Sequence, residues 1–204
     1  MFSSIFKFLA EREKEFDQIT ADRKLTLEKL SAYLNQQIND TISPIQLTYI
    51  CTHNSRRSHF GQIAAAVAAA YYQIANIKSY SGGTEVTAFN INAINALRSI
   101  GFLIQADEMT ANPNYQVQFS NERTIQCFSK IFDHATNPQN KFAAILTCSS
   151  ADEACPFIPG AEIRIATPYE DPKKGDGKEN VNEIYLKSFK EITRETLYTF
   201  SKLK

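Results

Sequence analysis

The sequence predicts an α/β protein with a largely parallel sheet flanked by helices and with a helical extension at its amino-terminal end. Short β-branched, apolar segments alternate along the chain with amphipathic or alanine-rich segments of helical period. Strands that alternate with helices are typical of parallel sheets. The clearest strand segments are 45–50 (IQLTYI) and 141–148 (KFAAILTC), which are apolar almost throughout, as buried strands are.

Residues 3–40 are predicted to be helical, because apolar side chains recur there at steps of three and four residues among charges. Thr20 or Asp22 could cap a second helix, so a helical hairpin is plausible, and Ser43-Pro44 ends it. We therefore expect an N-terminal helical extension over 1–44 and a second domain over 45–204. The apolar stripe of the extension must be buried, either on one face of the sheet or in a homodimer.

The remaining elements follow from the same patterns. Helices are predicted at 58–74, 91–100, 122–132 and 179–203. Strands are predicted at 45–50, at about 78–81 before Gly82-Gly83, at 141–148, and as a pair within 102–119 around an Asn-Pro-Asn turn. A long loop is expected from the end of the 141–148 strand to about Gly177.

Composition excludes several classes of protein. The 204 residues are 43% hydrophobic, with 22 basic and 22 acidic side chains, which argues against nucleic acid as a partner. No apolar run approaches about 18 residues, and Lys7 interrupts the first short one, so we expect neither a membrane span nor a cleaved signal. A cytoplasmic location is expected. Four cysteines in that compartment are more often reactive or buried thiols than structural disulfides.

The segment ICTHNSRRSH, 50–59, holds the candidate site. Cys51 follows a predicted strand and precedes a predicted helix, where backbone amides and the positive helix end favour an oxyanion and a thiolate. Arg57 can bind an oxyanion through its fork, and the Ser58 hydroxyl can donate to the sulfur. Asn54 suits a left-handed turn. The alternative is an ordinary turn with a buried cysteine and solvated arginines. The predicted oxyanion-binding residues are Thr52, His53, Asn54, Ser55, Arg56 and Arg57.

The stretch CTHNSRRS resembles the C-x5-R-S signature of the low-molecular-weight tyrosine phosphatase fold, which thioredoxin-coupled arsenate reductases share. The resemblance covers about residues 45–203. It implies a doubly wound, mainly parallel four-stranded sheet with Cys51 as the nucleophile. Both families carry Asp-Pro on a late loop, so by resemblance Asp171, in TPYEDPKKGDG, would be the general acid. Alone, this Asp-Pro would read as a solvated turn.

The segment ILTCSSADEACPFIP, 145–159, resembles the part of arsenate reductases in which two further cysteines relay oxidation. By resemblance, Cys51 attacks arsenate, Cys148 attacks Cys51, and Cys155 attacks Cys148, leaving a disulfide for thioredoxin. Cys148 and Cys155 cannot pair across a regular helix, because seven helical steps span about 10 Å and a disulfide needs Cα atoms about 5.5 Å apart. Pro156, Pro159 and Gly160 fit a loop that can rearrange. The alternative for this pair is two small buried side chains.

The resemblance thus implies a thiol-dependent arsenate reductase with catalytic residues Cys51, Arg57, Ser58, Asp171, Cys148 and Cys155, and with no cofactor or metal. The runner-up is a tyrosine phosphatase working through a cysteinyl phosphate. Phosphatases of this fold usually carry aromatic residues after Asp-Pro, where this chain has Lys173 and Lys174. A third reading is an anion-binding module without activity.

Some positions depart from the family pattern. His53 replaces a usual glycine, and Gln62 replaces a glutamate that some reductases place near a potassium site. Arg56 replaces a small or apolar residue or a cysteine; it could attract a more highly charged ligand, but solvent is the favoured expectation because loop arginines are mostly exposed. Cys127 is expected in the core, and His59 and His134 in packing or surface roles.

Overall fold

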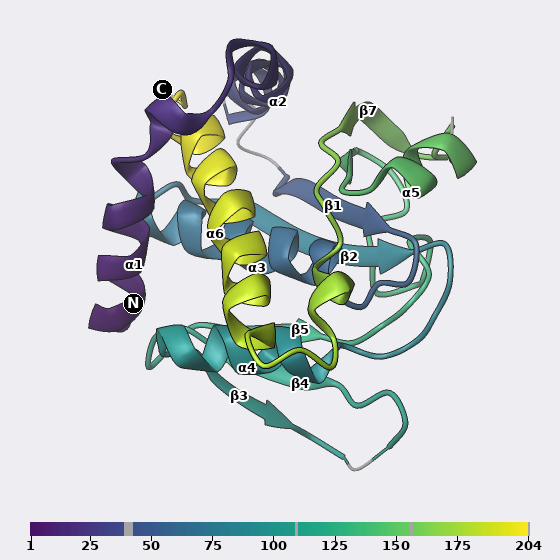
Figure 1. The fold of residues 1–204 in the computed structure, drawn as a ribbon. Coiled ribbons are helices and arrows are strands. Elements are labelled where there is room, and N and C mark those ends of the chain that lie inside the picture. The colour runs from purple at the N-terminus through teal and green to yellow at the C-terminus, as the bar shows by residue number, and fades with distance from the viewer. Residues whose placement is uncertain (39–42, 109, 156, 204) are drawn as a thin grey trace.

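The structure is a computed structural model that describes residues 1–38, 43–108, 110–155 and 157–203. Its main sheet has four strands in the order β2-β1-β6-β7, and every neighbouring pair is parallel (Figure 1). The strands are β1 (Ile45–Cys51), β2 (Ile77–Gly83), β6 (Phe142–Leu146) and β7 (Ala161–Ala166). The predicted doubly wound, mainly parallel four-stranded sheet is therefore confirmed.

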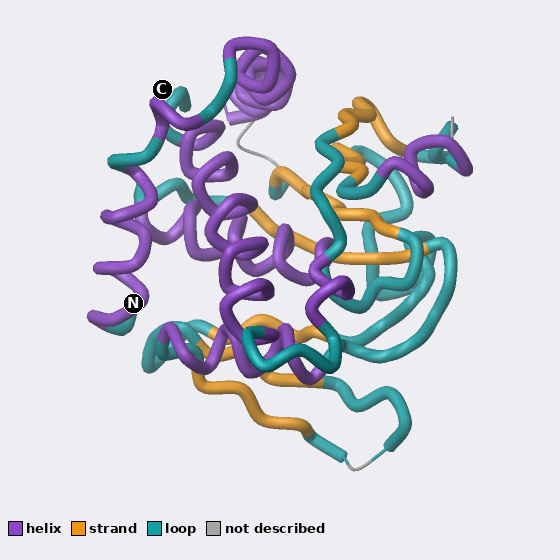
Figure 2. The backbone as a smooth tube through the Cα atoms, in the orientation of Figure 1, coloured by secondary structure: helices purple, strands orange, loops and turns teal. Residues whose placement is uncertain are grey.

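Helices cover both faces of this sheet (Figure 2). Along β1, Leu47 and Tyr49 face the larger core, whereas Ile50 joins a second cluster on the opposite face, as the two-residue period of a strand requires. The larger core lies under the helices α3 (Arg57–Tyr71), α4 (Ile91–Ile100) and α6 (Val181–Phe200), and α5 (Ser149–Ala154) lies on the second cluster. The predicted helices 58–74, 91–100 and 179–203 are thus confirmed as α3, α4 and α6.

The amino-terminal segment forms two helices, α1 (Ser3–Glu13) and α2 (Ala21–Ile38), joined by a 3-10 turn at Phe16–Gln18. Residues 39–40 of the predicted helical segment lie outside the described residues. Both helices lie against α6 (Figure 1) and bury Ile5, Leu9, Leu30 and Leu34 in the larger core. None of the helices in the described ranges is long and apolar enough to span a bilayer.

Three antiparallel strands form a second sheet, in the order β3-β4-β5. β3 (Leu103–Ala106) and β4 (Tyr115–Gln118) confirm the predicted hairpin. The predicted helix at 122–132 is wrong: its first part is β5 (Thr124–Cys127), which pairs with β4. The hydroxyl of Ser120 accepts hydrogen bonds from the amides of Glu122 and Arg123 at 3.3 and 3.0 Å. These bonds stabilise the turn that brings β5 back alongside β4. Cys127 is buried in the core, as expected.

The long loop predicted after β6 is also wrong, because it contains α5, β7 and a 3-10 turn, Pro172–Gly175. In β7, Ile163 and Ile165 alternate with Glu162 and Arg164, which is the pattern of a half-buried strand. The prolines and the glycine around 156–160 concealed that pattern, and Pro156 itself lies outside the described residues.

Gly61 allows α3 to lie close to β1. A Cβ atom at this position would be 2.2 Å from the ring of the buried Tyr49. Gly61→Ala should therefore lower the free energy of unfolding by about 2 kcal/mol. The added methyl group would overpack the core, and this cost exceeds the gain of about 1 kcal/mol that alanine brings over glycine through its higher helix propensity. Urea denaturation measures the change. In the double variant with Tyr49→Leu, Gly61→Ala should cost much less; a Gly61→Ala variant as stable as the parent would contradict the close contact.

Candidate active site at the carboxyl end of β1

The candidate site is the loop 52–56, between Cys51 at the end of β1 and the first turn of α3. Asn54 takes the left-handed conformation expected of it, with φ 42°, and its side chain is fully buried. Its Nδ2 donates to Ser58 Oγ at 2.8 Å, and its Oδ1 accepts from the amide of Lys130 at 2.8 Å. The Asn54 side chain therefore links the loop to α3 and to the chain that follows β5.

The loop carbonyls are bonded to the segment that follows β2. The Cys51 and Thr52 carbonyls accept from the amides of Thr84 and Glu85 at 3.2 and 2.8 Å, and Ser55 O accepts from the amide of Asn90 at 3.0 Å. Among the described residues, no protein group accepts a hydrogen bond from the backbone amides of 52–56. The loop thus offers several free N–H groups beside a helix N-terminus, the arrangement that binds oxyanions.

Gly83 makes this packing possible. A Cβ atom at Gly83 would lie 2.6 Å from Thr52 O and 2.7 Å from Asn54 N, too close for any other residue type. Sequence reasoning missed this role, although the Gly82-Gly83 pair after a predicted strand is the signal that could have indicated it.

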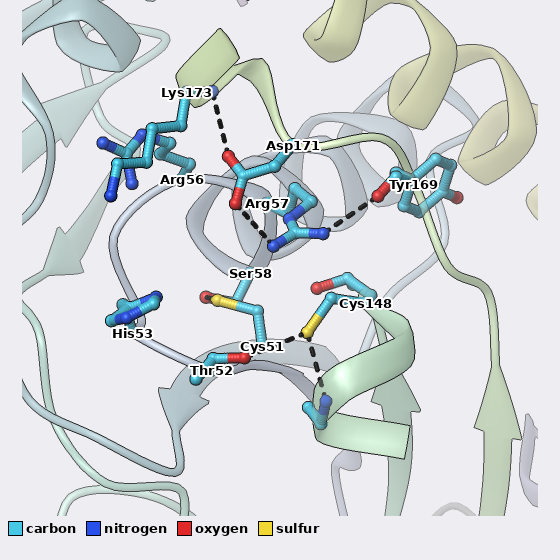
Figure 3. Close-up of polar contacts among 12 residues, drawn as sticks. Cys51, Thr52, His53, Arg56, Arg57, Ser58, Cys148, Tyr169, Asp171 and Lys173 are labelled. Atoms are coloured by element: carbon cyan, nitrogen blue, oxygen red, sulfur yellow. Dashed lines mark hydrogen bonds and ion pairs between the residues drawn. The ribbon is translucent and has the colours of Figure 1, made fainter. Parts of the chain in front are cut away.

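The thiol of Cys51 is buried, and its Sγ lies 3.1 Å from Ser58 Oγ (Figure 3). Since Ser58 Oγ already accepts from Asn54 Nδ2, its own proton is available to the sulfur. The contact predicted between Cys51 and Ser58 is present. The imidazole of His53 lies away from this contact, and its Nε2 is 3.5 Å from Glu85 Oε2.

Arg57 and Asp171 meet above the loop, although they are far apart in the sequence (Figure 3). Arg57 Nη2 lies 2.7 Å from Asp171 Oδ2, and Arg57 Nη1 donates to Tyr169 O at 2.9 Å. The other Asp171 oxygen accepts from the amide of Lys173 at 3.0 Å. The structure therefore brings Arg57 and Asp171 together on the side of the loop opposite to β1.

The prediction that Arg56 points to solvent is wrong. Arg56 Nε donates to Tyr185 Oη at 2.8 Å, and Arg56 Nη2 lies 3.1 Å from Asp176 Oδ2. Asp176 also accepts from Tyr185 Oη at 2.6 Å and from Asn92 Nδ2 at 3.0 Å. Because the Tyr185 and Asp176 partners are more than 100 residues away, no local pattern could reveal them. Arg56 fastens the loop to α6 and to the chain after Pro172–Gly175.

Cys148 lies beside the loop, at the start of α5. Its Sγ is 3.5 Å from Thr52 Oγ1 and accepts from the amide of Ala151 at 3.4 Å, so the sulfur caps the helix (Figure 3). Cys51 and Cys148 are both buried in the same apolar cluster. The structure thus brings the first and second candidate thiols to one edge of the sheet.

Cys155 is at the other end of α5, where it packs against the apolar cluster that includes Cys148, but the two thiols are not bonded to each other. Cys148 is the N-cap of this helix and Cys155 is its C-cap, and both are free thiols. Arg164 of β7 donates to Cys155 O at 2.9 Å and pairs with Asp152, which holds α5 in place. Burial raises the pKa of the Cys155 thiol. A bond between Cys148 and Cys155 requires α5 to unwind.

The loop that carries Asp171 is supported from α2, by contacts that sequence reasoning missed. Arg23 Nη2 donates to Pro168 O at 3.2 Å, and its guanidinium lies 4.8 Å from the centre of the Tyr169 ring. Arg23 Nε also donates to the buried Glu195 at 2.8 Å. Tyr169 O in turn accepts a hydrogen bond from Arg57. Arg23 is therefore connected to Arg57 of the candidate site through Tyr169.

Comparison with known proteins gives structural similarity only: no protein-family model and no curated sequence matches the chain. An arsenate reductase in its oxidized state has TM-score 0.52 and 17% identity, over 78% of this chain and 98% of that one. A low-molecular-weight phosphotyrosine phosphatase from Vibrio cholerae O395 has TM-score 0.50 and 13% identity, over 76% and 93%. A thioredoxin-dependent arsenate reductase from Corynebacterium glutamicum has TM-score 0.40 and 16% identity, over 94% of each chain. The first two similarities show that the chain has the fold that low-molecular-weight phosphotyrosine phosphatases and arsenate reductases share.

Proposed function

We propose that the chain is a thiol-dependent arsenate reductase. The oxyanion would be held by the free amides of 52–56 and by the Arg57 guanidinium, with Cys51 below it as the nucleophile. Asp171 lies on the opposite side of this loop, where a carboxyl group can protonate a departing oxygen. These resident groups would supply binding, a nucleophile and an acid.

The reaction runs in three thiol steps. The Cys51 thiolate bonds to arsenic, and one arsenate oxygen leaves as water with a proton from Asp171. The Cys148 thiolate then attacks Cys51 Sγ, and the electrons of the S–As bond pass to arsenic, which is released as arsenite. Cys155 finally attacks Cys148 and frees Cys51, which leaves a Cys148–Cys155 disulfide for a dithiol reductant such as thioredoxin.

The position of Cys148 carries the proposal. Hydrolysis of a cysteinyl phosphate by water consumes no second thiol, yet Cys148 Sγ lies 3.5 Å from the hydroxyl of Thr52, the residue next to Cys51. The Ala151 amide donates to the Cys148 sulfur at 3.4 Å, so both this amide and the Thr52 hydroxyl fix the position of the sulfur beside the loop. Exposed Lys173 and Lys174 follow Asp171-Pro172, where a phosphotyrosine ring would need an apolar wall.

One observation favours a phosphatase as the second candidate. Cys155 lies at the C-terminal end of α5, and Arg164 stabilises that end of the helix by donating a hydrogen bond to the Cys155 carbonyl. If α5 does not unwind, the relay stops at Cys148. Water would then have to hydrolyse a cysteinyl phosphate, and Cys148 and Cys155 would be spectators.

The relay can be tested with thioredoxin-coupled NADPH oxidation in the presence of arsenate, beside hydrolysis of an aryl phosphate. Cys51→Ser should abolish the arsenate-dependent rate, by at least about 10³-fold, because the nucleophile is lost. Cys148→Ser should do the same, whereas Cys127→Ser, a buried thiol outside the site, should leave the rate unchanged. Aryl phosphate hydrolysis that needs Cys51 and is indifferent to Cys148→Ser would contradict the reductase and support the phosphatase.

Disulfide mapping after a single turnover tests the last step. We expect a Cys148–Cys155 disulfide in the wild-type chain and a Cys51–Cys148 disulfide in Cys155→Ser, because the third thiol is then missing. Peptide mass mapping of alkylated samples distinguishes the two. Cys127 should be alkylated in both. A wild-type chain that keeps all four thiols free after exposure to arsenate would contradict the relay.

Arg23→Lys tests the support of the Asp171 loop. Lysine keeps the charge opposite Glu195 but loses the bond to Pro168 O and the stacking on Tyr169. We expect a fall in kcat of about 10-fold with a smaller change in KM, since a misplaced acid slows chemistry more than binding. Arg12→Lys, on α1 and paired with Glu15, is the control. An unchanged kcat in Arg23→Lys would mean that α2 does not position the loop.

A further inference from the structure

A second cavity lies away from the Cys51 loop, between α3, β2 and β5. Its volume is about 630 Å³, within the range of small-molecule sites. Its lining includes no residue of 51–58 or of 141–171. One wall is the alanine-rich face of α3, Ala66, Ala69 and Ala70, continued by Ile74 and by Ile125 of β5. This wall of the cavity is apolar, whereas polar side chains, including Gln62, Ser79 and Gln126, make up much of the remaining lining.

One end of the cavity carries a buried ammonium group. Lys130 lines the cavity and is only 4% exposed. Its Nζ donates to Phe128 O at 3.3 Å and lies 4.2 Å from the centre of the Phe128 ring, and no carboxylate of the described residues pairs with it. Burial lowers the pKa of Lys130 to about 8. A buried cation without a counterion is costly, so this position favours an anionic group.

A second lining residue carries an unsatisfied acceptor. Asn137 also lines the cavity and is 4% exposed. Its Nδ2 donates to Ser81 O and Phe132 O, both at 3.0 Å, whereas its Oδ1 has no hydrogen-bond partner among the described residues. Lys130 O accepts a hydrogen bond from the amide of Gly83 at 2.8 Å. Lys130 and Asn137 are therefore both hydrogen-bonded to the C-terminal end of β2, at Gly83 and Ser81.

The rim of the cavity has an excess of positive charge. Lys78 and Arg123 are exposed there beside a single acid, Glu122, and none of the three forms an ion pair with another described residue. Together with Lys130, the cavity has three cations and one carboxylate. A neutral apolar ligand would leave the Lys130 ammonium without a counterion and Asn137 Oδ1 without a hydrogen-bond partner.

We propose that this cavity binds a small carboxylate with an aromatic or aliphatic body and a hydroxyl or amide donor beside the carboxyl group. The carboxylate pairs with the Lys130 ammonium, the donor bonds to Asn137 Oδ1, and the body packs on Ala66, Ala69 and Ala70. This proposal is independent of the chemistry at Cys51, because the two sites share no lining residue.

Salicylate, a benzoate with a neighbouring hydroxyl, is a suitable probe for titration calorimetry on the full chain. We expect saturable binding at one site, unaffected by phosphate. Lys130→Met should weaken binding by about 10-fold or more, the value of a charge-assisted hydrogen bond, and Ala70→Phe should abolish binding by filling the cavity. Lys29→Met, which removes an exposed charge from α2, is the matched control. Benzoate should bind more weakly than salicylate.

Two outcomes would overturn the proposal. One is the absence of saturable salicylate binding at millimolar concentrations. The other is equal affinity in Ala70→Phe and the parent chain, since binding would then lie elsewhere. Ala70 is half-buried at the cavity wall, so its variant tests the site even if Lys130→Met does not fold. Thermal unfolding of each variant identifies a folding defect.

Discussion

The two hydrogen bonds of the buried Asn54 side chain hold the candidate site together. Their partners are Ser58 Oγ on α3 and the amide of Lys130. The carboxamide donates to the first and accepts from the second while the Asn54 backbone is left-handed, with φ 42°. The Lys130 carbonyl then bonds to Gly83, which lies against Thr52 and Asn54. The same hydrogen bonds therefore connect the loop 52–56, the end of β2 and Lys130, which lines the cavity between α3, β2 and β5.

The β1–β6 register brings the second thiol to this frame. Ile50 is paired with Leu146, and the amide of Thr147 donates to Ile50 O at 2.7 Å. Cys51 and Cys148 therefore leave the sheet at the same edge, although 96 residues separate Thr52 from Cys148. A slip of one residue would turn the side chains of β6 to the opposite face and take Cys148 away from Cys51.

Local residues explain what could be predicted from the sequence. The loop 52–56, the left-handed Asn54 and the contact of Cys51 with Ser58 all arise within the eight residues 51–58, and the strand and the helix on either side show their own local patterns. The failures involve distant partners: β5 is a strand because β4 lies beside it, and Arg56 is turned inward by Tyr185 and Asp176. The strand β7 is a different case, because its alternation is present in the sequence but was outweighed by the prolines and the glycine before it. The cavity between α3, β2 and β5 could not be predicted from a local sequence pattern either, because these three elements come together only in the folded chain.

The position of α6 has a consequence for the order of folding. This helix packs against α1, α2, α3 and α4, and the bond from Arg23 to Glu195 joins residues that are 172 positions apart. Contacts of such long range form late, because loop closure must precede any gain from packing. The apolar sides of α1 and α2 therefore lack the helix that they contact most while most of the chain is being synthesised. A chaperone that binds exposed apolar helices has its natural target there, until α6 arrives and closes the core.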